Sequence, residues 1–115
     1  MRNMSFAKTM QQVEDETKDV TRRLNWGVLK VGDLVQAVDR CMGFKKGEHP
    51  RKLKVIRVLD IRRERLDAIT QADCVREGFP EMTPAAFIEM FCRMNKCKSD
   101  QWVNRVEFEY VHMEI

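Results

Sequence analysis

The chain has 115 residues, of which 43% are hydrophobic and 34% charged, and this composition excludes a disordered tail or a fibre. No apolar run is long enough to cross a bilayer, and the first residues lack the apolar segment of a secretion signal. We therefore expect one domain over residues 1–115, located in the cytoplasm and without a membrane partner.

The four cysteines and two histidines do not form a recognisable metal-binding pattern. Cys92 and Cys97 are too far apart for a Cys-x-x-Cys pair, and Cys41 and Cys74 are isolated. Without a secretion signal, we expect reduced thiols that act as small hydrophobic side chains. The sequence predicts no metal site and no cofactor.

The net charge of +3 is unevenly distributed. Residues 40–65 contain ten Lys or Arg against three acids, whereas the remaining chain contains eleven basic and fifteen acidic residues. This asymmetry favours an electropositive face that meets phosphates. A solvated loop and strand surface would explain it equally well.

The first expected element is a short amphipathic helix over residues 7–15. Phe6, Met10 and Val13 recur at spacings of four and three, as on the buried face of a helix. Ser5 precedes this segment and is its expected N-cap.

Three strands are expected next. Apolar residues alternate with charged or hydroxyl residues over 20–24, which predicts a short strand. A tight turn at 31–33 precedes a strand over 34–38, whose apolar residues indicate burial on both faces. A loop with two glycines then leads to the longest strand candidate, residues 53–61, which is rich in β-branched side chains.

Two helices and a final strand complete the prediction. Thr70 resembles the start of a capping box, and Gly78 is a natural stop for the short helix between them. Thr83-Pro84 begins a second helix. Its Met and Phe stripe is typical of core, and it consists of Phe87, Met90, Phe91 and Met94. Residues 106–110 alternate as in a half-buried strand. This order predicts an α+β fold, a small mixed β-barrel flanked by short helices.

The segment Thr17-Lys-Asp-Val-Thr-Arg-Arg23 carries most of the chemical information. On a regular strand, Lys18 and Arg22 would share one face, and Thr21 would lie on the other face with Arg23. At a bend after a helix, Lys18 and Thr21 can converge. Taken alone, the Lys-x-x-Thr spacing is common.

This segment resembles the Gly-x-Lys-x-x-Thr-x-Arg signature of ASCH domains, which belong to the PUA-like superfamily. Later segments resemble that family in the same order: Gly32-Asp33 before a strand, a helix ending Arg76-Glu-Gly-Phe79, and the strand Val106-Glu-Phe-Glu109. The resemblance covers residues 5–111 and implies a PUA-like barrel with a cleft beside the first helix. The loop at 42–48 also resembles that of members carried by bacteriophages.

One position departs from the family signature. The family has glycine two residues before the lysine, and this chain has Glu16. If that glycine supplies a positive φ angle, Glu16 must force a different turn.

In the ASCH family the cleft is associated with RNA or nucleoside ligands, and the resemblance implies the same class of partner here. A subset of small bacterial members are amidohydrolases that deacetylate 4-acetylcytidine with a lysine, a threonine and a glutamate. Lys18, Thr21 and Glu77 match these three positions, and Arg22 and Arg23 complete the implied cleft.

The implied reaction needs three linked roles. Thr21 would be the nucleophile, and Lys18 would be its base if burial or a neighbouring cation lowers its pKa. Glu77 would protonate the leaving amine or activate water. Simpler roles also fit: Lys18 binds a phosphate or pairs with Glu14, Thr21 is an ordinary strand residue, and Glu77 is solvated near a helix end. Binding is the leading interpretation, because fold resemblance alone does not confer an activity.

A second candidate surface is the basic loop, residues 44–52. Its phosphate-attracting and base-stacking side chains are Phe44, Lys45, Lys46, His49, Arg51 and Lys52. Trp26 is a further stacking candidate, and packing against the core is the alternative for both aromatic residues. A third class of function is docking on a host protein, with the basic face steering the encounter. The oligomeric state stays open.

Overall fold

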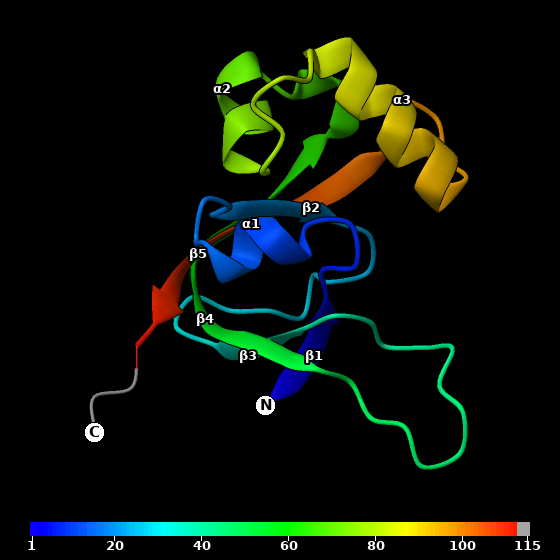
Figure 1. The fold of residues 1–115 in the computed structure, drawn as a ribbon. Helices are drawn as coiled ribbons and strands as arrows, with labels where there is room; N and C mark the ends of the chain where they lie inside the picture. The colour runs from blue at the N-terminus through cyan, green and yellow to red at the C-terminus, as the bar shows by residue number, and fades with distance from the viewer. Residues whose placement is uncertain (113–115) are drawn as a thin grey trace.

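The computed structural model describes residues 1–112 (Figure 1). Within them, the chain forms five strands and four short helical segments. In order they are β1 (Arg2–Ser5), α1 (Met10–Glu14), β2 (Val20–Arg23), β3 (Leu34–Val38), β4 (Lys52–Arg65), the 3₁₀ helix η1 (Leu66–Ala68), α2 (Gln71–Arg76), α3 (Pro84–Asn95) and β5 (Trp102–Val111).

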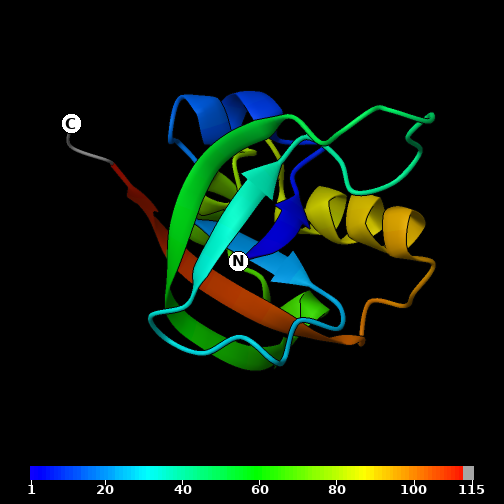
Figure 2. The ribbon, with the colours of Figure 1, turned by 90° about the horizontal axis from the view of Figure 1, so that it is seen from below.

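The strands form one mixed sheet in the order β1-β3-β4-β5-β2. β1 and β3 are parallel, and the other neighbouring pairs are antiparallel. The sheet curls into a half-barrel with short helices (Figure 2), which confirms the predicted α+β, barrel-like fold. Strand β1 was not predicted.

Two apolar clusters stabilise this arrangement. The first lies inside the curl and contains Met4, Phe6, Val13, Leu29, Val35, Ala37, Ile56, Val58, Val106 and Phe108. The second lies beneath α2 and α3 and contains Leu66, Ile69, Cys74, Phe87, Phe91 and Val103. The two clusters meet along β5, because Val103 belongs to one and Val106 to the other.

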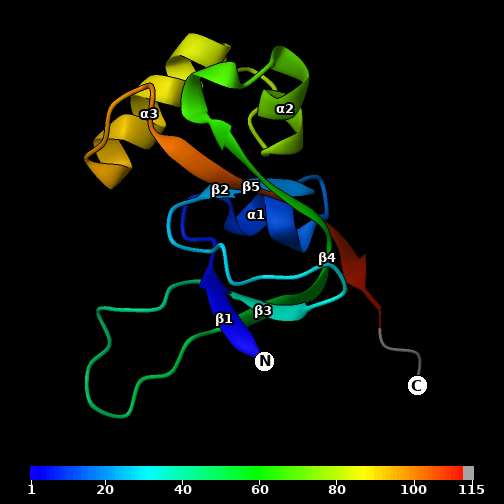
Figure 3. The same cartoon turned by 180° about the vertical axis from the view of Figure 1, so that it is seen from behind.

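Strand β4 is longer than the predicted 53–61. Residues 62–65 continue the pairing with β5 and lead to η1 and α2, so β4 and β5 connect the curled end of the sheet to the end that carries α2 and α3 (Figure 3). The sequence did not predict this extension, because the side chains of Arg62-Arg63-Glu64-Arg65 are all charged and mostly exposed.

The predicted helix over 7–15 is wrong in extent and in its cap. Phe6 extends the pairing of β1, because its N–H donates to Val38 O at 2.9 Å, and its ring packs on Phe108. Ser5 ends β1, and Thr9 takes the N-cap position of α1. Phe6 therefore belongs with β1, whereas Met10 and Val13 lie in α1, so their helical spacing does not mark one helix.

Glu16 adopts a φ of 60°, the left-handed conformation that glycine favours. The expectation that Glu16 forces a turn without a positive φ is therefore wrong. Its carboxylate accepts from Lys54 Nζ at 3.3 Å and contacts His112 Nε2 at 2.9 Å. These contacts accompany a backbone conformation that is unfavourable for a residue with a Cβ.

Candidate functional site

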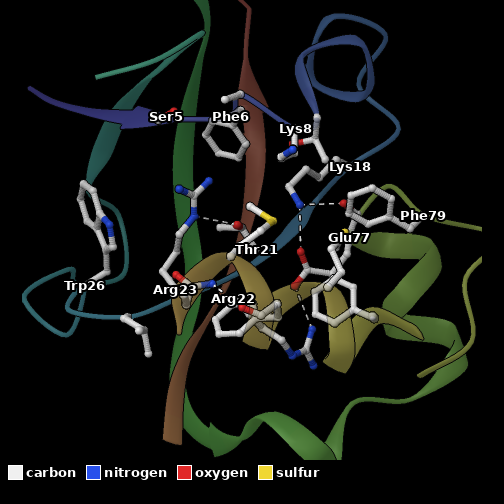
Figure 4. A pocket seen from close by; sticks show the side chains of 18 of the residues that line it. Ser5, Phe6, Lys8, Lys18, Thr21, Arg22, Arg23, Trp26, Glu77 and Phe79 are labelled. Atoms are coloured by element: carbon white, nitrogen blue, oxygen red, sulfur yellow. Dashed lines mark hydrogen bonds and ion pairs between the residues drawn. The ribbon is translucent and has the colours of Figure 1, made fainter. Parts of the chain in front are cut away.

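A cavity of about 430 Å³ lies between the link from β1 to α1, strand β2 and helix α3 (Figure 4). Apolar and charged side chains both face it. Its lining includes Phe6, Lys8, Lys18, Thr21, Arg22, Arg23, Trp26, Glu77, Phe79, Phe87, Met90, Phe91 and Met94.

Lys18 and Glu77 form a buried pair at one side of this pocket. The Nζ of Lys18 donates to Oε1 of Glu77 at 2.9 Å and to the main-chain oxygen of Glu77 at 2.7 Å. Each residue is only 3% exposed. Burial lowers the pKa of Lys18 below its ordinary value, and Glu77 opposes this effect.

The end of α2 places Glu77. Gly78 follows it with a φ of +98°, and the N–H of Phe79 donates to Cys74 O at 2.9 Å. This is a Schellman motif, in which a left-handed residue closes the helix. The prediction that Gly78 ends this helix is confirmed, and the turn delivers Glu77 and Phe79 to the pocket.

Arg22 is held in a buried ionic network on the far side of Glu77. One terminal nitrogen donates to Glu77 Oε2 at 3.1 Å, and the other contacts Glu64 at 2.6 Å and Asp73. Arg105 binds Asp73 from β5 at 2.8 Å. The hydrogen bond from Arg105 is the largest of the causes that hold the pKa of Asp73 well below its usual range.

Arg23 lies on the opposite face of β2 with Thr21. Its Nε donates to the Thr21 hydroxyl oxygen at 3.0 Å, and its guanidinium lies 4.7 Å from the centre of the Phe6 ring. Figure 4 shows this guanidinium between Trp26 and Thr21, below Phe6. The strand alternation expected for Thr21 and Arg23 is therefore confirmed.

The structure brings the three predicted catalytic residues to one pocket, since Lys18, Thr21 and Glu77 all line it. Lys18 and Arg22 share Glu77 as a partner, as strand alternation favoured, while Lys18 and Thr21 face the same cavity. Within residues 1–112, no hydrogen bond joins Lys18 to Thr21. The alternative pairing of Lys18 with Glu14 is wrong.

The walls of the pocket include five aromatic side chains. Trp26 packs against the first core cluster, as the alternative expected, and also lines the cavity, while its stacking on a base stays a prediction. The predicted core stripe of α3 is confirmed for Phe87 and Phe91, which are buried in the second cluster and also face the pocket, whereas Met94 is 50% exposed and is not core. Neither Phe6 nor Phe79 was assigned to a site from the sequence. An apolar pattern alone does not distinguish a pocket wall from a core.

The basic loop lies apart from this pocket. It extends from the sheet between β3 and β4 (Figures 1 and 3), and none of its residues lines the cavity. Phe44 packs under the guanidinium of Arg40, 4.4 Å from the ring centre. The exposed cations of the loop are Lys45, Lys46, Arg51 and Lys52, of which Arg51 pairs with Glu14 at 3.0 Å.

The described part of the chain contains no group of three His, Cys, Asp or Glu side chains arranged for a metal ion. Its four cysteines are free thiols. None of its helices has the length and apolar character of a membrane span.

No protein-family model matches the sequence, and a search of curated proteins finds no match. The solved structures that are similar in fold include the following three. Protein EF3133 from Enterococcus faecalis V583, described under the family model DUF984, has a TM-score of 0.70 and 14% identity over 99% of this chain and 84% of that one. An ASCH domain from Lactobacillus crispatus JV V101 has a TM-score of 0.69 and 13% identity over 95% of this chain and 78% of that one.

The hypothetical protein PH0355 has a TM-score of 0.63 and 12% identity, and the match covers 96% of each chain. Sequence identities this low establish the architecture alone. The mixed, curled five-stranded sheet and its short helices are those of an ASCH domain, and the protein therefore has the ASCH fold.

Proposed function

We propose that the pocket binds a base of single-stranded RNA or a modified nucleoside. The observation that carries this proposal is the combination of aromatic walls with buried polar groups in one cavity of about 430 Å³. Pockets that bury small ligands commonly have a few hundred cubic ångströms and this mixture of surfaces.

The aromatic rings supply stacking surfaces. Trp26 and Phe79 are only partly buried and line the cavity from two different segments, so a planar base can contact either ring. Stacking of a base on an aromatic side chain is worth about 1–3 kcal/mol and suits every base. This explains affinity for bases as a class.

The polar groups supply orientation. The Thr21 hydroxyl accepts from Arg23 and keeps its own proton to donate, while Glu77 offers acceptors and Lys18 offers donors. A nucleobase edge carries donors and acceptors side by side, so it complements this set. In this proposal the basic loop is a separate surface that binds the phosphate backbone of RNA.

Tryptophan fluorescence tests this proposal directly. The chain has two tryptophans, and Trp102 is 51% exposed and does not line the pocket. In Trp102→Phe protein, emission from Trp26 should change when single-stranded RNA oligonucleotides or nucleosides, including 4-acetylcytidine, are added. In Trp26→Phe protein, emission from Trp102 should stay constant. Absence of any response, together with no heat of binding in calorimetry, would refute the proposal.

A second candidate function is hydrolysis of the acetyl amide of 4-acetylcytidine. The specific observation in its favour is a buried lysine with a lowered pKa beside a threonine hydroxyl and a carboxylate in one pocket. A neutral lysine amine can accept the proton of the Thr21 hydroxyl as that oxygen attacks the amide carbon. The proton that Lys18 takes would then pass through Glu77, its hydrogen-bonded partner, to the departing amine of cytidine, and water would hydrolyse the acetyl ester on Thr21 to acetate.

Chromatography of 4-acetylcytidine after incubation with the protein decides between binding and catalysis. Turnover to cytidine and acetate should disappear in Thr21→Ala and persist in Thr17→Ala, which removes an exposed threonine four residues earlier. Binding without turnover in the wild type would leave binding as the function. A protein partner retained in place of nucleic acid would favour docking on another protein.

A further inference from the structure

The pocket has an excess of positive charge. Four of its charged lining residues are cations and one is an anion: Lys8, Lys18, Arg22 and Arg23 against Glu77. Which cations are available to a ligand depends on the partners that each already has.

Two of the four are already neutralised. Arg22 contacts three carboxylates, and Lys18 donates twice to Glu77. Each oxygen of Glu77 therefore already accepts from one cation, Oε1 from Lys18 and Oε2 from Arg22. Neither cation has a free charge to offer to an anionic ligand.

Arg23 is in a different situation. Among residues 1–112 its guanidinium has one hydrogen-bond partner, the neutral hydroxyl of Thr21, and no carboxylate in an ion pair. Burial lowers the pKa of Arg23 to about 10, which reflects the cost of placing this charge away from water. Its two terminal nitrogens form a fork with no acceptor in the described part of the chain.

Lys8 is the second available cation. It lies on the link between β1 and α1, is exposed, and forms no ion pair with any described carboxylate. Arg23 and Lys8 thus line the same cavity with their charges unmatched. A cavity with an aromatic lining and an unmatched guanidinium fork suits a ligand that has both a planar ring and a phosphate.

We infer that the ligand is a nucleotide rather than a neutral nucleoside, with its phosphate bound by Arg23 and Lys8. This inference rests on the proposed function, because it assigns the base to the aromatic walls. It adds the charge class of the ligand and names the residues that select it.

Calorimetry with matched ligands tests the inference. Each of the four common nucleosides is compared with its 5′-monophosphate, its 3′-monophosphate and a dinucleoside monophosphate. The best phosphorylated form should bind about tenfold or more tightly than its nucleoside, since a charge-assisted hydrogen bond contributes this much. The three phosphorylated forms distinguish a terminal phosphate from an internal RNA phosphate.

Two variants locate the phosphate contact. Arg23→Gln should remove most of the advantage of the phosphorylated ligand over its own nucleoside, and Arg23→Lys should recover part of it. Because Arg23 packs on Phe6, the exposed Lys8→Gln provides a second variant whose folding is not in question, and it should reduce the same advantage.

The outcomes separate the two claims. Equal affinity for nucleosides and nucleotides would overturn this inference and leave the proposed function standing. A phosphate advantage that survives in both Arg23→Gln and Lys8→Gln would also overturn it. Failure of every nucleoside and nucleotide to bind the wild-type protein would overturn the proposed function and this inference together.

Discussion

Lys18 donates to both the main-chain oxygen and the carboxylate of Glu77, 59 residues later in the chain. The two hydrogen bonds connect the start of β2 to the end of α2, so they fix one side of the pocket. They also set the protonation of the lysine, because Glu77 is the main influence that raises its pKa against burial.

Glu77→Gln should therefore lower the pKa of Lys18 further. The amide keeps an acceptor for the Lys18 ammonium but removes the negative charge that favours it. NMR titration of the lysine side chain measures the change, and Glu14→Gln is the matched control because Glu14 pairs with Arg51 instead. A pKa of Lys18 that rises toward 10.5 in Glu77→Gln would contradict this account.

Asp73→Asn should reduce stability and flatten its dependence on acid pH. The folded-state pKa of Asp73 lies below its ordinary value of 3.8, so the unfolded chain takes up the proton first as the pH falls. The stability that this carboxylate contributes is present above the unfolded-state pKa of 3.8 and is lost as the pH falls from there through the lower folded-state pKa.

Removing one charge of this buried network should cost about 3–5 kcal/mol at neutral pH. Urea unfolding from pH 7 to pH 2 measures both effects. Asp67→Asn is the control, since within residues 1–112 this exposed carboxylate pairs with Arg65 alone and should contribute much less to stability. An equal loss of stability in the two variants would show that the buried network around Asp73 contributes no more than an exposed ion pair.

Lys45→Glu with Lys46→Glu should weaken binding of single-stranded RNA. Reversing two exposed cations removes two phosphate contacts, so the negative slope of log affinity against log salt should become less steep by about two. Filter binding at several salt concentrations measures the slope. The matched control reverses the charges of Arg62 and Arg63 in the same way, since both are exposed near the other end of β4. Unchanged affinity in the loop variant would exclude the loop from RNA binding.

Glu16→Gly should be more stable than Glu16→Ala by about 0.5–1 kcal/mol. Both variants lose the contacts with Lys54 and His112, but only glycine relaxes at a φ of 60°. Thermal unfolding of the two variants gives the difference. Greater stability of the alanine variant would show that this turn changes conformation when the carboxylate is removed.

The sequence predicted the fold class and most elements, because strands β3, β4 and β5 and helices α2 and α3 have clear apolar periodicity or caps. It did not predict β1. Only Met4 of its four residues is fully buried, and a short edge strand in parallel pairing shows no regular alternation. Phe6 was consequently placed with the following helix.

The candidate site was predicted in part. The motif from Lys18 to Arg23 led to the pocket, yet it did not distinguish the two arginines. Arg22 and Arg23 are adjacent in sequence and identical in type, but Arg22 meets three carboxylates while Arg23 meets none among the described residues. Those partners come from β4 and α2, and only the folded chain determines which face of β2 they reach.

The long-range pairing of β2 has a practical consequence for finding the ligand. β2 pairs with β5, with Val20 opposite Glu107, so the pocket exists only when distant parts of the chain are assembled. A ligand that binds only this assembled state stabilises the whole fold, by about 2.7 kcal/mol at a concentration of one hundred times its Kd. For a domain of this size the melting temperature then rises by on the order of 10 °C. Differential scanning fluorimetry against a nucleotide library can therefore identify the ligand without an activity assay.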